Sequence, residues 1–179
     1  MLIARPARRD HLGAFNRDIL CDIVEGEQPI GSLAFGIDTM RATITLAGQA
    51  YTAQRASEAR AELLHESLIR AMKGGEKPRN PWALKDDTGR VLALAERTYE
   101  SFAVSRGEES FTFRKKGRPY HLYREDSDRS LGSVGQQKFF TRLLHMDLPD
   151  EFDRPFQVFL LVLLLGLSLQ NMESLGRSR

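Results

Sequence analysis

The sequence predicts a mainly β protein of the α+β class: a closed antiparallel barrel of about 10–12 strands around a buried hydrophobic C-terminal helix. Two observations predict this fold. Residues 156–169 are apolar on every face of a helix, so the helix must be surrounded by protein or lipid. The remaining chain contains many short alternating segments separated by turn residues, a pattern typical of antiparallel sheets. A barrel closed around the helix accounts for both and leaves no exposed sheet edge.

The chain of 179 residues is the size of one domain. We expect an N-terminal arm at residues 1–16, a single barrel domain at 17–172 and a tail at 173–179. The N-terminus lacks the apolar core of a signal peptide, so a cytoplasmic location is expected. The formal net charge of +2 is not that of a dedicated nucleic-acid binder, and no nucleic-acid partner is expected. The one cysteine excludes an intramolecular disulfide framework, and Cys21 is interpreted as a small strand residue.

The first half of the barrel is predicted from alternation, which is clearest where Ala42, Ile44 and Leu46 face one way and two threonines face the other. The predicted strands are Ile19–Val24, Ile30–Phe35, Arg41–Leu46 and Gln49–Arg55.

The pattern then changes to a helical period. Leu64, Leu68 and Met72 are spaced by four residues, Ser57 is a candidate N-cap and two glycines follow residue 73. We therefore expect an amphipathic helix near 57–73, lying on the body of the domain.

Strand signals return after residue 81 and continue to the C-terminal helix. The predicted strands are Trp82–Lys85, Arg90–Glu96, Phe102–Ser105, Phe111–Lys115, Tyr120–Arg124, Leu131–Val134 and Lys138–His145. An acidic loop at 146–153 leads to the helix Phe156–Leu169, with Pro155 tolerated in its first turn. Its 14 apolar residues fall short of the roughly 20 needed to span a bilayer, which favours a core helix. A short membrane anchor is the alternative.

Three segments carry a resemblance to a known family: Tyr51–Arg55, the hairpin Trp82–Ala93 and the terminal Phe156–Leu169. Together with the run of hairpins over residues 17–170, they resemble the LURP-one-related and phospholipid scramblase branch of the tubby C-terminal-like fold. The resemblance implies a barrel of about twelve strands around a central helix, and contact with phospholipid. The chain departs from scramblases in having one cysteine and no proline-rich arm, and no basic pocket of tubby proteins can be aligned residue by residue.

Motifs for catalysis, metals and cofactors are incomplete. His65-Glu66 begins a zinc-protease motif, but Ile69 stands where the second histidine is required. Asp126 and Asp128 resemble the start of a calcium loop, but Leu131 replaces its glycine. We therefore expect no catalytic residues, no metal site and no cofactor. An enzyme with an unrecognised site is a further alternative.

One basic cluster is the candidate binding site. It contains Arg114, Lys115, Lys116 and Arg118, with Arg124 beyond, next to aromatic residues. Such charges attract anionic membranes, although a solvated hairpin end has the same composition. The function expected is that of a non-enzymatic binding or scaffold protein of the LURP-one-related type, contacting anionic phospholipid at a membrane surface. A scramblase-like protein anchored by its C-terminal helix is the alternative.

Overall fold

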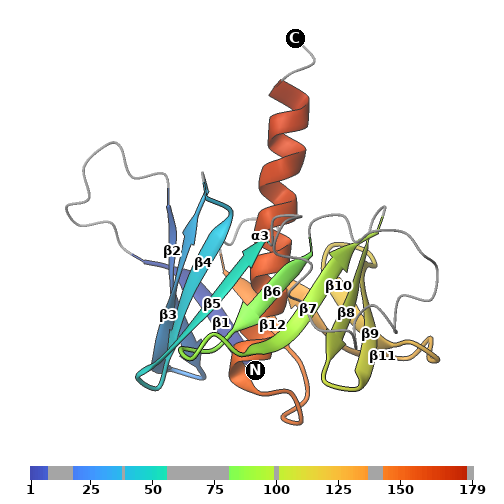
Figure 1. Cartoon of the computed structure of the whole chain (residues 1–179), viewed down its shortest axis with the longest axis horizontal. Coiled ribbons are helices and arrows are strands. Elements are labelled where there is room, and N and C mark those ends of the chain that lie inside the picture. Colours follow the sequence, from blue (N-terminus) through green and yellow to red (C-terminus); the bar gives the residue numbers. More distant parts are fainter. Residues whose placement is uncertain (8–17, 38, 56–80, 99–100, 137–142, 177–179) are drawn as a thin grey trace.

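The structure, a computed structural model, describes residues 1–7, 18–37, 39–55, 81–98, 101–136 and 143–176, with backbone alone for 169–176. Twelve antiparallel strands close into a barrel around helix α3 (Arg154–Gly176) (Figure 1). Each strand pairs with the next in sequence, and β1 pairs with β12 to complete the barrel. This confirms the predicted fold class. The strands are β1 (Leu2–Pro6), β2 (Ile19–Glu25), β3 (Gln28–Gly36), β4 (Arg41–Leu46), β5 (Gln49–Arg55), β6 (Trp82–Lys85), β7 (Val91–Arg97), β8 (Ser101–Arg106), β9 (Glu109–Lys115), β10 (Tyr120–Arg124), β11 (Ser130–Gly135) and β12 (Leu144–Asp147).

The strands fill the barrel with every second side chain. In β4 the residues Ala42, Ile44 and Leu46 are buried, while Arg41 and Thr43 are exposed. Successive side chains of a strand point to opposite faces, so one row faces the core and the other faces outward.

Helix α3 occupies the space that these inward rows enclose. Phe156, Val158, Phe159 and every residue from Leu160 to Leu163 have at most 1% of their surface exposed. Gln157 is also buried, and its side-chain amide donates to the carbonyl oxygen of Phe152 at 2.8 Å. The predicted burial of the helix on all faces is therefore confirmed over this part of its length.

The barrel has two rims, and α3 runs from one to the other. The lower rim of Figure 1 carries the connections after the even-numbered strands, and α3 begins there. The upper rim carries the connections after the odd-numbered strands, and the C-terminal part of α3 projects above it. Leu164 and Leu165 are only partly buried and Ser168 is exposed, so the helix leaves the barrel between residues 164 and 168. Within the described residues, no helix has both the length and the apolarity needed to cross a bilayer.

The prediction of an arm at residues 1–16 is wrong for Leu2–Pro6, which form β1. Leu2 and Ala4 are completely buried, and Leu2 pairs with Met146 of β12. The segment is too short for its alternation to stand out in the sequence, and one of its two partner strands lies at the other end of the chain.

The end of the barrel also differs from its prediction. Of the strand predicted at Lys138–His145, Leu144 and His145 belong to β12, which continues to Asp147 with Met146 in an inward position, while residues 138–142 lie outside the described residues. Helix α3 begins two residues before the predicted Phe156 and extends to Gly176 instead of ending at Leu169. The backbone N–H of Phe156 donates to the Asp153 carboxylate at 2.9 Å, which caps the first turn. The amphipathic helix predicted near 57–73 lies outside the described residues.

Candidate functional site

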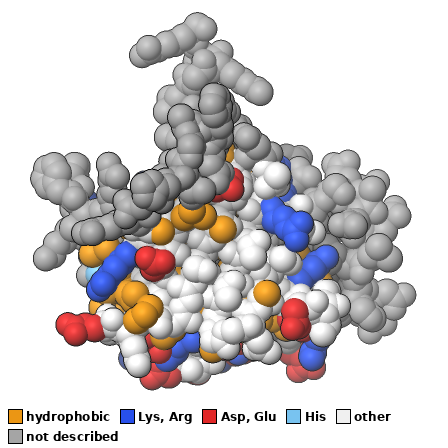
Figure 2. Space-filling model, turned by 90° about the vertical axis from the view of Figure 1, so that its left-hand side faces the viewer, with side chains coloured by type: hydrophobic (Ala, Val, Ile, Leu, Met, Phe, Trp, Pro, Cys, Tyr) orange, Lys and Arg blue, Asp and Glu red, His pale blue; other side chains and the backbone are white. Residues whose placement is uncertain are grey.

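The described residues of the two rims carry opposite net charge. We count the last two residues at each strand end, the described connections and the first residue of α3. The upper rim has eight cations and two acids, a formal excess of six positive charges. The lower rim has six cations and thirteen acids, an excess of seven negative charges. On the face shown in Figure 2, most acidic side chains lie toward the lower rim. The upper-rim cations are Arg5, Arg41, Arg55, Arg97, Arg114, Lys115, Lys116 and Arg118, and its acids are Asp18 and Glu96. The lower-rim cations are Lys85, Arg90, Arg106, Arg124, Arg129 and Arg154. The lower-rim acids are Glu25, Glu27, Asp86, Asp87, Glu108, Glu109, Glu125, Asp126, Asp128, Asp147, Asp150, Glu151 and Asp153.

The tip of the β9–β10 hairpin presents three cations at the upper rim. Lys115, Lys116 and Arg118 are all exposed. Gly117 between them has φ of 74°, which glycine adopts without strain, and the N–H of Lys116 donates to the Pro119 carbonyl at 3.1 Å. No ion pair of Lys115 or Lys116 is found within the described part of the chain. The backbone of the hairpin tip is therefore held in a defined turn, and the tip exposes positive charge to the solvent.

The other two residues of the predicted cluster lie elsewhere. Arg114 belongs to the upper-rim end of β9, but its side chain lies along the outer wall, where its guanidinium is 3.4 Å from the Asp128 carboxylate and 4.4 Å from the centre of the Tyr123 ring. Arg124 lies at the opposite end of the hairpin, on the lower rim, 3.5 Å from Glu109 and 3.7 Å from Glu151. The structure thus brings three of the five predicted residues together and separates the other two.

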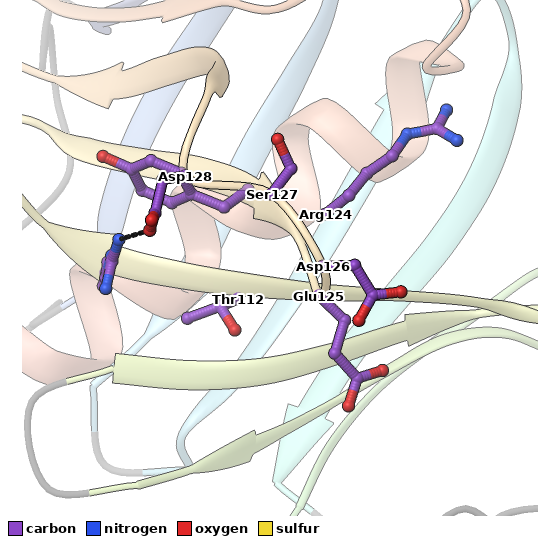
Figure 3. A pocket seen from close by; sticks show the side chains of 8 residues that line it. Thr112, Arg124, Glu125, Asp126, Ser127 and Asp128 are labelled. Carbon is purple, nitrogen blue, oxygen red and sulfur yellow. Dashed lines mark hydrogen bonds and ion pairs between the residues drawn. The ribbon is translucent and has the colours of Figure 1, made fainter.

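Arg114 lines a small hollow on the outer wall, which is shown in Figure 3. Its volume is about 190 Å³, and its lining includes Thr112, Ser127 and Asp128. In Figure 3 the Arg124 side chain points away from Glu125 and Asp126. Because acids outnumber cations in this lining, the hollow does not favour an anion.

A larger pocket of about 560 Å³ opens at the upper rim where α3 leaves the barrel. Lys115 and Arg118 of the hairpin contribute its positive charge. Its apolar wall comes mainly from the helix and from the start of β12, with Leu144, Leu164, Leu165 and Leu167. Sequence reasoning missed the three helical leucines because it placed the whole apolar run inside the barrel. The sequence signal that could have identified them is the length of the apolar run. A helix of this run is longer than the short strands around it can enclose, so its last residues must lie at the rim.

Among the titratable side chains with shifted pKa values are His121 and Cys21. Partial burial, and then the charge of Lys116, lower the pKa of His121, whose Nδ1 lies 3.0 Å from the Ser130 hydroxyl oxygen. Burial, and then the charge of Asp22, raise the pKa of the Cys21 thiol. A buried thiol with a raised pKa is a poor nucleophile, which agrees with its interpretation as a packing residue.

Within the described ranges, no three His, Cys, Asp or Glu side chains are grouped so that they could hold a metal ion. Comparison of the chain with family models, curated proteins and solved structures found no match. The geometry and charge of the upper rim are therefore the features that point to a function.

Proposed function

We propose that the protein is a non-enzymatic, peripheral binding protein that places its upper rim on an anionic phospholipid surface. The observation that supports this proposal is the separation of charge between the described residues of the two rims, an excess of six positive charges against seven negative. The proposed location is cytoplasmic, at the membrane surface. A place among the LURP-one-related and scramblase-like proteins is part of the same proposal and rests on the resemblance alone.

The charge separation favours one orientation at a membrane. Each Lys or Arg close to an anionic membrane contributes about 1 kcal/mol of binding. The acidic lower rim is repelled by the same surface, so it should face the solvent. The Lys115–Arg118 hairpin tip should then lie among the lipid headgroups.

The scramblase-like alternative uses α3 as a membrane anchor. It requires the helix to leave the barrel, although Phe156 to Leu163 are buried there on every face. Emptying the barrel would expose both the helix and the inward rows of the strands to water. Peripheral contact leaves the barrel intact and is therefore the function that we favour.

The proposal is tested by co-sedimentation with vesicles. The protein should bind vesicles of phosphatidylcholine and phosphatidylserine at low salt, ignore pure phosphatidylcholine, and dissociate as salt rises. Replacing Lys115, Lys116 and Arg118 with serine should remove about 3 kcal/mol, roughly a hundredfold in affinity.

The matched control removes three lower-rim charges: Lys85→Ser, Arg90→Ser and Arg129→Ser. It changes the net charge equally but should leave vesicle binding close to that of the wild type. Equal losses in both triple variants would show that net charge alone acts. A wild-type protein that ignores anionic vesicles at low salt would overturn the proposal.

A further inference from the structure

We propose that the upper-rim pocket binds one molecule of a single-chain anionic amphiphile, a carboxylate or phosphate head on one acyl chain. This deepens the proposed function and rests on it for the choice of lipid. It goes beyond the proposed function because it assigns a defined binding site for one lipid molecule. Electrostatic attraction to a membrane surface requires no such site.

The polar half of the pocket fits an anionic head. Lys115 continues the row of Phe111 and Phe113, whose side chains face the barrel interior, but it lies one step beyond the core and is exposed. Arg118 lines the pocket from the other side of the Gly117 turn. Two cations on one short hairpin therefore stand at the mouth of the pocket.

The apolar half fits an acyl chain. Leu164 and Leu165 are the first residues after the buried run 156–163 that the strands do not fully cover, and Leu144 of β12 is also partly exposed. Leu167, one turn after Leu164, completes the helical side of the wall. An apolar wall next to a pair of cations matches an amphiphile better than it matches a small polar anion, which would leave the leucines in contact with water.

The wall between the hairpin and the helix is closely packed. A Cβ atom at Gly135 would lie 3.1 Å from Pro119 of the hairpin and 3.8 Å from Leu164 of the helix. The backbone of Gly135 therefore lies close to both the hairpin and the helix, and a side chain at this position would press against Pro119. The volume of about 560 Å³ lies within the range of ligand pockets, roughly 300–1,000 Å³.

The test uses soluble single-chain probes below their micelle-forming concentrations, followed by titration calorimetry. Dodecanoate and dodecyl phosphate should each bind the full chain saturably at one to one. Dodecyltrimethylammonium, butyrate and inorganic phosphate should bind at least tenfold more weakly, because each lacks the negative head or the long chain. Equal binding of the cationic probe, or binding without saturation, would overturn the inference.

A pocket-filling variant separates this site from the surface contact. Ser168 lines the pocket and is exposed, so Ser168→Phe should occupy the pocket without disturbing the core. It should weaken dodecanoate binding at least tenfold and leave binding to anionic vesicles unchanged, since no charge is lost. Leu165→Gln, which also keeps the charge, is the second variant if Ser168→Phe lowers the melting temperature.

The possible results are distinct. Wild-type affinity for dodecanoate in a folded pocket variant overturns the inference while the proposed function stands. The opposite result is also possible. If dodecanoate binds saturably to the wild type and this binding is lost in Ser168→Phe, the pocket is supported. If the same wild-type protein does not bind anionic vesicles, the proposed surface contact is overturned.

Discussion

Gly166 shows how closely the helix and the barrel wall fit at the upper rim. A Cβ atom at this position would lie 2.7 Å from the Trp82 ring, a distance that requires one of the two to move. Trp82 is only 3% exposed, and its ring stacks with Phe35 at 6.2 Å between centres. The ring therefore has little room to move.

We expect Gly166→Val to lower the free energy of unfolding by about 1–3 kcal/mol, the usual cost of overpacking a core. The helix propensity gained by replacing glycine is smaller than this, because valine is itself a weak helix former. Thermal and urea melts measure the change, and Ser168→Val on the exposed side of the helix is the control. Equal stability of Gly166→Val and the wild type would contradict the close packing.

The lowered pKa of His121 predicts how the stability of the protein depends on pH. The unfolded chain takes up a proton at the ordinary pKa of about 6.5, while the folded protein takes it up at lower pH. Protonation therefore favours the unfolded state, and stability should fall as pH decreases below about 6.5. Because the Lys116 charge contributes to the shift, Lys116→Ser should raise the pKa of His121 in an NMR titration. A pKa that stays unchanged in Lys116→Ser would contradict this electrostatic contribution.

At the scale of the element, α3 forms the centre of the hydrophobic core of the barrel. Leu163 is fully buried in the middle of the apolar run. Leu163→Asp would place an unpaired carboxylate there, at a cost comparable to the whole stability of a domain, about 5–15 kcal/mol. We expect this variant, and a chain ending at residue 155, to fail to fold.

Ser168→Asp is the control for Leu163→Asp, because it adds the same charge to the same helix at an exposed position. Its free energy of unfolding should lie within about 0.5 kcal/mol of the wild-type value. Circular dichroism of the truncated chain gives the decisive measurement. A cooperative melt with an intact β signal would refute the role of α3 as core and favour the membrane anchor.

In the wild type, the amides of residues 156–163 should exchange among the slowest in the chain.

At the scale of the whole molecule, β1 closes the barrel by pairing with both β2 and β12. Removing residues 2–6 would expose the edges of both neighbours and take Leu2 and Ala4 from the core. We expect such a chain to aggregate or to lose its cooperative melt. Arg5→Ser, which changes an exposed side chain of the same strand, is the control. A soluble deletion variant with wild-type stability would show that these residues are the dispensable arm that the sequence first suggested.

The candidate site was only partly predictable. The charge run Arg114–Arg118 is local, so the hairpin tip could be found in the sequence. Arg114 and Arg124 could not be placed from composition, since side chains alternate between the two faces of a strand and a five-residue strand reaches from one rim to the other. The leucines of the pocket depend on where the helix leaves the barrel, which is a relation between distant segments.

The sequence by itself determined the elements with a strong local pattern: the hairpins, the buried helix and the barrel that these two features require. Alternation and helical period are properties of neighbouring residues, so they can be read without a partner. Only the tertiary structure decided that Leu2–Pro6 is a strand, that α3 projects beyond the upper rim, and that Lys115 and Arg118 meet Leu164 and Leu165 in one pocket. Each of these depends on contacts between residues far apart in the chain. Such contacts form because closing the barrel buries apolar surface and pairs both open edges, and that gain belongs to the assembled barrel and not to any one segment.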